Sequence, residues 1–176
     1  VTGSHTYYAT GVFTVTVTVT DDDGDAGTAS FDVTVSAPPI SFLGATHASA
    51  KGVTSLTVAA PAAQAGDVLI ASIDVSGTPT ISAPAGWTLI RATASATSLT
   101  KATYWHLVGP GDPATYDWTF SASSATTAII LAYAGVDGSA PIAAHSGQGN
   151  GSSGQIAAPS VTTTGAGQVL VGLFTI

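Results

Sequence analysis

The densest group of chemically active side chains in the sequence is the acidic run Asp21-Asp22-Asp23-Gly24-Asp25. Its four carboxylates supply hard oxygen ligands, which Ca²⁺ prefers, and nearby backbone carbonyls can complete the coordination shell. The spacing does not fit an EF-hand loop, and an Asp/Gly-rich turn between two strands forms without a metal. Two hypotheses follow: Asp21, Asp22, Asp23 and Asp25 are calcium ligands, or the run is a plain solvated turn. Calcium is the only cofactor that the sequence suggests.

Aromatic residues form a second candidate site. Tyr116, Trp118 and Phe120 alternate along the sequence, so they share one face of an expected strand, and Trp87 follows the turn at 84–86. A row of rings at this spacing is typical of a sugar-stacking platform, with Tyr116, Trp118 and Trp87 as the carbohydrate-binding residues. The alternative, which we favour for the row, is that these rings fill the core, because the sequence has few other large apolar residues.

No catalytic motif is recognisable in the sequence. His106 and His145-Ser146 supply residue types for Ser-His-Asp hydrolysis, but no Gly-x-Ser-x-Gly turn accompanies them. A glycosidase would need two carboxylates such as Asp112 and Asp117, yet Asp112 lies in a Gly/Pro turn, where Asp is expected anyway. We predict no catalytic residue and no enzymatic activity.

Asn150 is the only Asn of the protein and begins the triplet Asn-Gly-Ser in a Gly/Ser-rich stretch that we expect to be an exposed loop. This triplet is an acceptor sequence for N-glycosylation. Such triplets also arise by chance, and a bacterial source would usually leave this one bare. Asn150 is the candidate glycosylation site.

The elements that must position these residues are strands. The 176 residues include no Glu, no Met and only three Lys and Arg together, whereas Thr, Val and Ile are abundant. This composition lacks straight-chain helix formers and is rich in strand formers, so it predicts an all-β fold and excludes a helical one. The absence of Cys excludes disulfides and thiolate metal sites.

Charge and hydropathy limit the partners. A net charge of −7 with three scattered cations excludes a nucleic-acid partner and a polybasic membrane contact. The longest apolar stretch, residues 128–136, is too short to span a bilayer, so no membrane insertion is expected. Neither a signal peptide nor an initiator Met begins the sequence, and we expect a mature product or an excerpt of a longer protein.

The sequence divides at Ala37-Pro38-Pro39, where two prolines favour an extended linker. Residues 1–37 carry five Asp and no cation, whereas residues 38–176 carry five Asp and three cations. In the first part, Phe13, Val15, Val17 and Val19 alternate with Thr, and a second alternating run at 31–35 follows the acidic run. These runs predict a hairpin of two long strands, whose apolar face needs cover from other strands because a lone hairpin is marginally stable.

The second part, residues 38–176, predicts a two-sheet antiparallel β-sandwich of jelly-roll type. Its short apolar or alternating runs are separated by Gly/Pro/Asp turns, with no helical period. The candidate strands are Ser55–Val58, Val68–Val75, Trp87–Ala92, Thr103–Val108, Tyr116–Phe120, Thr126–Tyr133, Ser160–Thr164 and Val169–Phe174.

The first part resembles a known family. The segments His5–Ala9, Gly11–Gly24 and Thr28–Val35 are similar to the C-terminal half of a PKD domain. That family is an immunoglobulin-like β-sandwich found in extracellular surface proteins, secreted hydrolases and adhesins. The resemblance covers residues 3–36 and lacks the family's upstream Trp-Asp-Phe-Gly-Asp-Gly region, so it implies that residues 1–37 are a partial domain.

The second part resembles a poorly characterised β-sandwich domain of bacterial secreted and phage tail-associated proteins. The similar segments are Ala65–Ala71, Ala83–Ile90, Tyr116–Ser121, Ala132–Asp137 and Ala158–Thr164. Further strands follow in that family after the segment that matches residues 169–172. The resemblance therefore implies that residues 38–176 lack the last strands of the sandwich.

Three functions are compatible with these features. The favoured one is a non-enzymatic structural or adhesive module at the cell surface or outside the cell, a repeat or subunit of an adhesin, fibre or filament. Its partners would be copies of itself or neighbouring domains of the same chain, because strand edges with so few Lys residues are poorly protected against pairing. The alternative is a carbohydrate-binding accessory module of a secreted hydrolase, with glycans as partners. An enzyme is the third.

Overall fold

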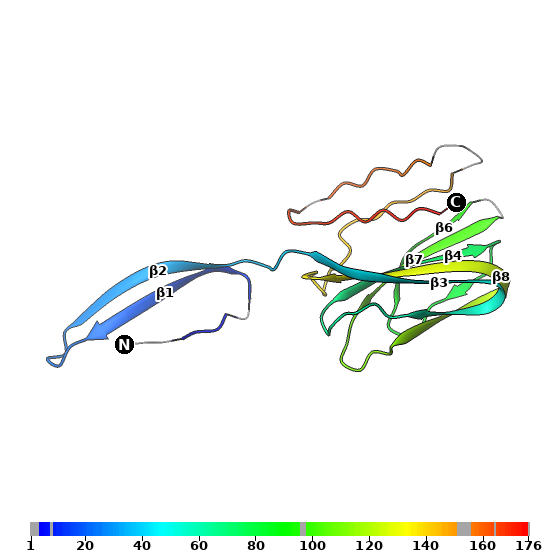
Figure 1. Cartoon of the computed structure of the whole chain (residues 1–176). Coiled ribbons are helices and arrows are strands. Elements are labelled where there is room, and N and C mark those ends of the chain that lie inside the picture. The colour runs from blue at the N-terminus through cyan, green and yellow to red at the C-terminus, as the bar shows by residue number, and fades with distance from the viewer. Residues whose placement is uncertain (1–3, 8, 96–97, 151–155, 164, 176) are drawn as a thin grey trace. The chain divides into compact units, whose positions relative to one another are not determined.

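The computed structural model describes residues 4–7, 9–95, 98–150, 156–163 and 165–175. These residues form eight β-strands and no helix, which confirms the all-β fold expected from composition (Figure 1). No described segment is therefore a helix that could cross a membrane. The protein separates into two compact units, Val1–Pro38 and Pro39–Ile176.

The first unit is an antiparallel hairpin of β1 (Gly11–Thr20) and β2 (Ala26–Val35), which confirms the hairpin expected from the two alternating runs. The register places apolar residues opposite each other on one face, as in the pairs Phe13–Val33 and Val15–Phe31. The other face is polar. On it, the Thr14 hydroxyl donates a hydrogen bond of 2.8 Å to Asp32, one of several cross-strand pairs.

The apolar face of the hairpin is largely open. Phe31 is 55% exposed and Val17 is 47% exposed. Within this unit, the Tyr7 ring lies 4.8 Å from the Phe13 ring, so the segment before β1 covers part of the face. The rest of the apolar surface has no partner among the described residues of this unit.

The second unit is one folded sheet of six antiparallel strands. These are β3 (Ser41–Ala59), β4 (Val68–Ser76), β5 (Ile81–Ser82), β6 (Thr88–Ser95), β7 (Leu99–Leu107) and β8 (Thr115–Ala134). Their order is β3-β8-β4-β7-β6, and β5 also pairs with β8.

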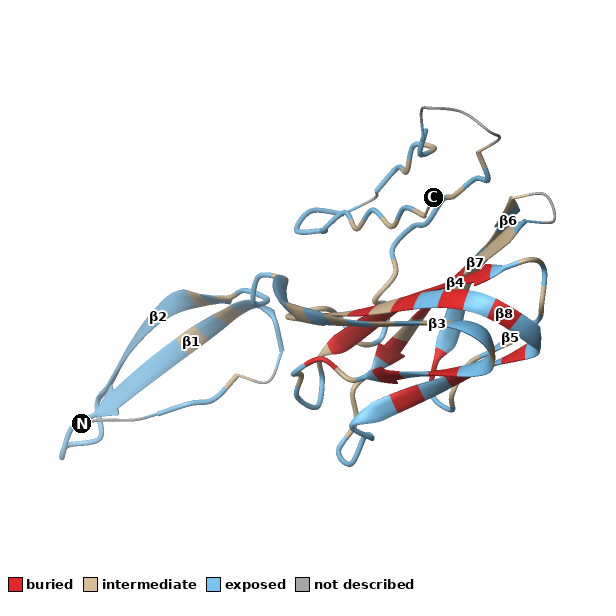
Figure 2. Cartoon of the chain, turned by 45° about the vertical axis from the view of Figure 1, so that its right-hand side comes forward, coloured by how far each residue is buried: buried red, intermediate tan, exposed pale blue. Residues whose placement is uncertain are grey.

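Two long strands, β3 and β8, turn this sheet into two facing layers. Their register shifts between Ala50 and Ser55, where the paired strands change direction. Beyond the shift, residues 55–59 of β3 with residues 115–120 of β8 and β5 form a small layer. It faces a larger layer made of the remainder of β3 and β8 with β4, β7 and β6 (Figure 2). The arrangement is that of an antiparallel sandwich.

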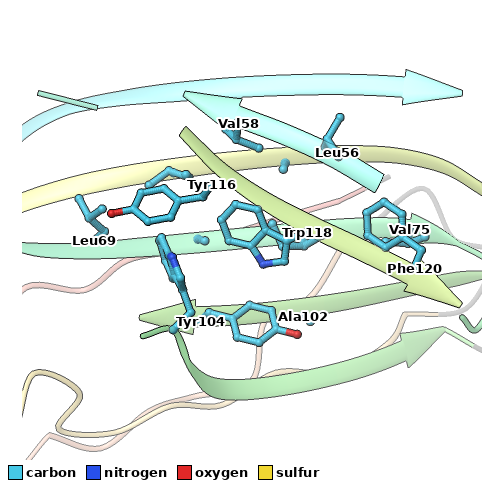
Figure 3. Close-up of a cluster of buried hydrophobic side chains, with 14 of the residues drawn as sticks. Leu56, Val58, Leu69, Val75, Ala102, Tyr104, Tyr116, Trp118 and Phe120 are labelled. Carbon is cyan, nitrogen blue, oxygen red and sulfur yellow. The ribbon is translucent and has the colours of Figure 1, made fainter. Parts of the chain in front are cut away.

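The core fills the space between the two layers. It consists of inward-facing side chains from both layers, among them Leu56, Val58, Leu69, Val75, Tyr104, Trp118 and Phe120 (Figure 3). Ile73 and Ile130 belong to the same core. The alternation of β8 explains this placement, because Tyr116, Trp118 and Phe120 point inward while the residues between them are exposed. Strand β4 is buried on both faces from Val68 to Val75, since the segment that follows β8 covers its outer face.

Several strand predictions are wrong in extent. Residues 160–163 and 169–174, within the predicted strands Ser160–Thr164 and Val169–Phe174, belong to no strand. The predicted strands Tyr116–Phe120 and Thr126–Tyr133 are parts of the single strand β8. Strand β3 begins at Ser41, well before the predicted start at Ser55, because its inward-facing residues Ala48 and Ala50 are too small to give an apolar pattern.

Candidate functional site

The acidic run forms the turn between β1 and β2 and is held by its own hydrogen bonds. Asp21 Oδ1 accepts the backbone N–H of Asp23 at 3.2 Å and that of Asp25 at 2.8 Å. Gly24 has φ of 92°, a left-handed conformation that Gly adopts without steric cost. Among the described residues, no three His, Asp or Glu side chains converge as a metal site would require. Calcium binding by Asp21, Asp22, Asp23 and Asp25 remains a prediction.

The aromatic residues proposed for sugar stacking lie inside the sandwich. Trp118 is fully buried and Tyr116 is 3% exposed, both on the inward face of β8. Trp87, at the end of the turn before β6, packs its ring 5.1 Å from that of Trp118 and is also buried. None of the three rings offers an open face to a glycan, and all three have the environment that the core alternative predicts.

A cluster around His106 is the most organised group of polar side chains in the second unit. His106 points inward from β7 and is buried. Its Nδ1 lies 2.9 Å from the carbonyl oxygen of Gly86, and its Nε2 lies 2.5 Å from Asp112 Oδ2. The same carboxylate oxygen accepts the Gly109 N–H at 3.1 Å and the Tyr116 hydroxyl at 3.3 Å. The cluster therefore joins two turns to strands β7 and β8.

The electrostatics of this cluster follow from its contacts. Partial burial disfavours the charged carboxylate, but His106 and the Gly109 N–H outweigh that cost, so the pKa of Asp112 lies below its usual value. Burial and the nearby carboxylate raise the pKa of Tyr116 to about 12. Both ring nitrogens of His106 face acceptor oxygens, the Gly86 carbonyl and the Asp112 carboxylate.

The chemistry available to this cluster is limited. A hollow of about 310 Å³ adjoins Asp112 and Tyr116, lined mainly by the small residues of the neighbouring turns. The hydrogen-bond partners of His106 are a carbonyl and a carboxylate, neither of which is an alcohol or thiol nucleophile of the kind that acyl transfer uses. What the cluster does is hold the turn at 109–113 against the end of the core, where Trp87 stacks 5.3 Å from the His106 ring.

A larger groove, of about 1250 Å³, lies between the outer face of the larger layer and the segment that follows β8. Lys101 of β7, which lines the groove, pairs with Asp74 of β4 at 3.2 Å. Thr175 donates to Asp74 Oδ1 at 2.5 Å, and its oxygen accepts from Lys101 at 2.7 Å. Arg91 of β6 donates to the Gly147 carbonyl at 2.6 Å. These polar contacts attach the segment to the sheet at both Gly147 and Thr175.

The side chain of Asn150 is engaged with its own loop. Its Nδ2 donates to the Ala157 carbonyl at 3.1 Å, and its Oδ1 accepts from Gln148 Nε2 at 3.1 Å. The two residues that follow it in the acceptor triplet lie outside the described residues. Glycosylation at Asn150 remains a prediction.

Sequence reasoning does not find the His106–Asp112 pair. It assigns Asp112 as an ordinary turn residue, because the sequence does not indicate that the turn at 109–113 folds back beside strand β7. One feature of the sequence does indicate that His106 is buried. Alternate residues of a strand lie on the same face, so His106 lies on the same face of β7 as the core residues Tyr104 and Ala102.

Comparison of the protein with protein-family models, curated proteins and solved structures finds no match.

Proposed function

We propose that this protein is a non-enzymatic structural or adhesive module of an extracellular surface, a repeat or subunit of an adhesin, fibre or filament. The observation that carries the proposal is the hairpin of the first unit, which has one apolar face and one polar face. In an antiparallel sheet such an apolar face is packed against further strands, and the described residues of this unit supply none.

The exposed apolar face is costly when it has no cover. Burying a Val or Phe side chain stabilises a protein by roughly 1.5–3 kcal/mol. Phe31, Val17 and Val19 are each at least about half exposed, so strands that cover them would gain several such contributions. A hairpin of two strands is marginal in water without this cover. We infer that strands of a neighbouring domain, or of another copy of this protein, cover the apolar face of the β1–β2 hairpin.

The polar face supports the same role. Its Thr, Ser and Asp side chains hydrogen-bond across the strands, as in Thr14–Asp32 at 2.8 Å and Thr16–Ser30 at 2.9 Å. Cross-strand pairs of this kind stabilise a sheet whose other face is packed. The resemblance of residues 3–36 to PKD domains supports the extracellular placement.

The test uses the whole 176-residue protein and a double variant, Val17→Thr with Phe31→Thr. Static light scattering and electron microscopy over a concentration series should show assembly of the unaltered protein and the loss of assembly beyond a dimer in the double variant. The matched control is Thr16→Ser with Thr18→Ser, which changes the polar face alone and should assemble normally. Dispersed monomers of the unaltered protein at every concentration would overturn completion between copies.

A further inference from the structure

Strand β3 is an edge strand along its whole length. It lies at the end of the strand order and pairs only with β8 among the described residues. Its other edge therefore presents a row of backbone N–H and C=O groups without strand partners. From Ser41 to Ala50 this segment contains no Asp, Lys, Arg or Pro, and side chains such as those of Phe42, Ala45 and Ser49 are exposed. An uncharged and accessible edge of this length is a template for pairing with another strand.

The other edges of the second unit are protected. At β6, the register shifts between Leu89 and Arg91, which breaks the regular ladder. The backbone of Gly149 lies directly against the same edge, since a Cβ on this residue would stand 2.8 Å from the Ala94 carbonyl oxygen. The edge at β5 is only two residues long. Strand β3 has one such irregularity near its start, a register shift against β8 between Phe42 and Gly44, and its ladder with β8 is regular from Gly44 to Ala50.

We propose that Gly44–Ala50 of β3, the regular part of this edge, pairs antiparallel with the same segment of a second copy of this protein, about a two-fold axis. Two identical strands in antiparallel orientation match every donor with an acceptor, and this segment carries no fixed charge that would repel its copy. The small residues Gly44, Ala45 and Ala48 leave room for the cross-strand neighbours. Pairing joins the two larger layers into one continuous sheet.

This inference rests on the proposed structural role but concerns a different surface from the hairpin. The two surfaces can therefore fail separately. Dimerisation through β3 would persist in the Val17→Thr/Phe31→Thr variant, and hairpin-dependent assembly would persist in variants of β3. Comparing the two sets of variants separates the two proposals.

The first experiment places a charge on the edge. In the Val17→Thr/Phe31→Thr background, where the hairpin no longer contributes to assembly, light scattering should show a mass rising with concentration from about 17.2 kDa towards twice that value. Ala45→Lys with Ser49→Lys should raise the dimer dissociation constant at least about tenfold, because like charges then face each other across the axis. Thr127→Lys is the matched control, since Thr127 is exposed beside Ser49 on β8, one strand away from the edge, and it should dimerise normally. Circular dichroism and melting curves establish that each variant folds.

The second experiment uses the absence of Cys from the protein. Single Cys variants at Ala45, His47 and Ser49 can form disulfides only between copies. Pairing over Gly44–Ala50 centres the two-fold axis on His47, so position 47 faces its own copy and should oxidise rapidly to a covalent dimer, whereas positions 45 and 49 should oxidise slowly. A monomeric mass at all concentrations would overturn the inference. So would a dimer that survives the Lys variants of β3, or one that is lost only in the hairpin variant.

Discussion

Most substitutions of core residues lower the stability of a protein, but replacing Thr126 on β8 should raise it. Its side chain is buried at 4% exposure, and its hydroxyl has no hydrogen-bond partner among the described residues. Burying a hydroxyl without a partner costs about 1–3 kcal/mol in protein mutational data. Val has nearly the same shape without the hydroxyl, so Thr126→Val should raise the free energy of unfolding by about 1 kcal/mol. For a protein of this length the Tm should rise by roughly 2–4 °C.

The matched control is the next residue. Thr127→Val makes the same chemical change on the exposed side of the same strand, where the hydroxyl is solvated, and should change stability by less than about 0.5 kcal/mol. Thermal and urea unfolding, monitored by circular dichroism, measure both variants. A loss of stability in Thr126→Val would refute the reasoning, because it would mean that the hydroxyl has a partner in solution and contributes to the fold.

Four further predictions follow from the core, the His106 cluster and the hairpin turn. Trp118→Ala should destabilise the protein by about 3–5 kcal/mol, measured by urea unfolding, because it removes the fully buried ring of β8; a loss below about 1 kcal/mol would contradict that packing. The pKa of Asp112 is lowered in the folded protein, so its ionised carboxylate stabilises the fold above the unfolded pKa of about 4, and this stability is lost as pH falls through the folded pKa. The free energy of unfolding of Asp112→Asn should therefore fall less between neutral and acid pH than that of the unaltered protein, and an equal fall would contradict the assignment. The raised pKa of Tyr116 gives stability that is present below about pH 10 and lost as pH rises towards about 12, and Tyr116→Phe should lack this alkaline loss in pH-dependent melting curves; an identical loss would assign it to another group. Chelation of calcium should leave the Tm unchanged, because Asp21 already accepts two backbone N–H groups, and a fall in Tm would support the calcium hypothesis instead.

The sequence predicts those parts of the fold in which the type of each residue, apolar or polar, indicates whether its side chain is buried or exposed. Phe13, Val15 and Val17 alternate with Thr, so a strand with one apolar face is the only regular element that separates the two sets. The same alternation marks Tyr116 and Trp118 as inward-facing residues of β8. In both cases one face is strongly apolar, and a shift of register by one residue would expose it.

The parts that the sequence does not predict depend on residues far apart along it. Asp112 contacts His106 because a turn folds back beside β7, and neither residue carries a local sign of the other. The early part of β3 escapes prediction because Ala48 and Ala50 bury little surface themselves and are inward-facing only because β8 lies alongside. Residues 169–175 have an apolar composition, but with no strand paired to them they stay outside the sheet.

The pairing of Ser41 with Ala134 has a mechanical consequence. The backbone enters β3 and leaves β8 at the same end of their ladder, so tension along the polypeptide acts across the strands at that end. Once the contacts of Arg91 and Thr175 are broken, the hydrogen bonds between β3 and β8 break one residue pair at a time from that end. They are not loaded all together, as they would be if the two strands were pulled in shear. The second unit should therefore extend under modest force and re-form when the tension is released, as a compliant spacer would.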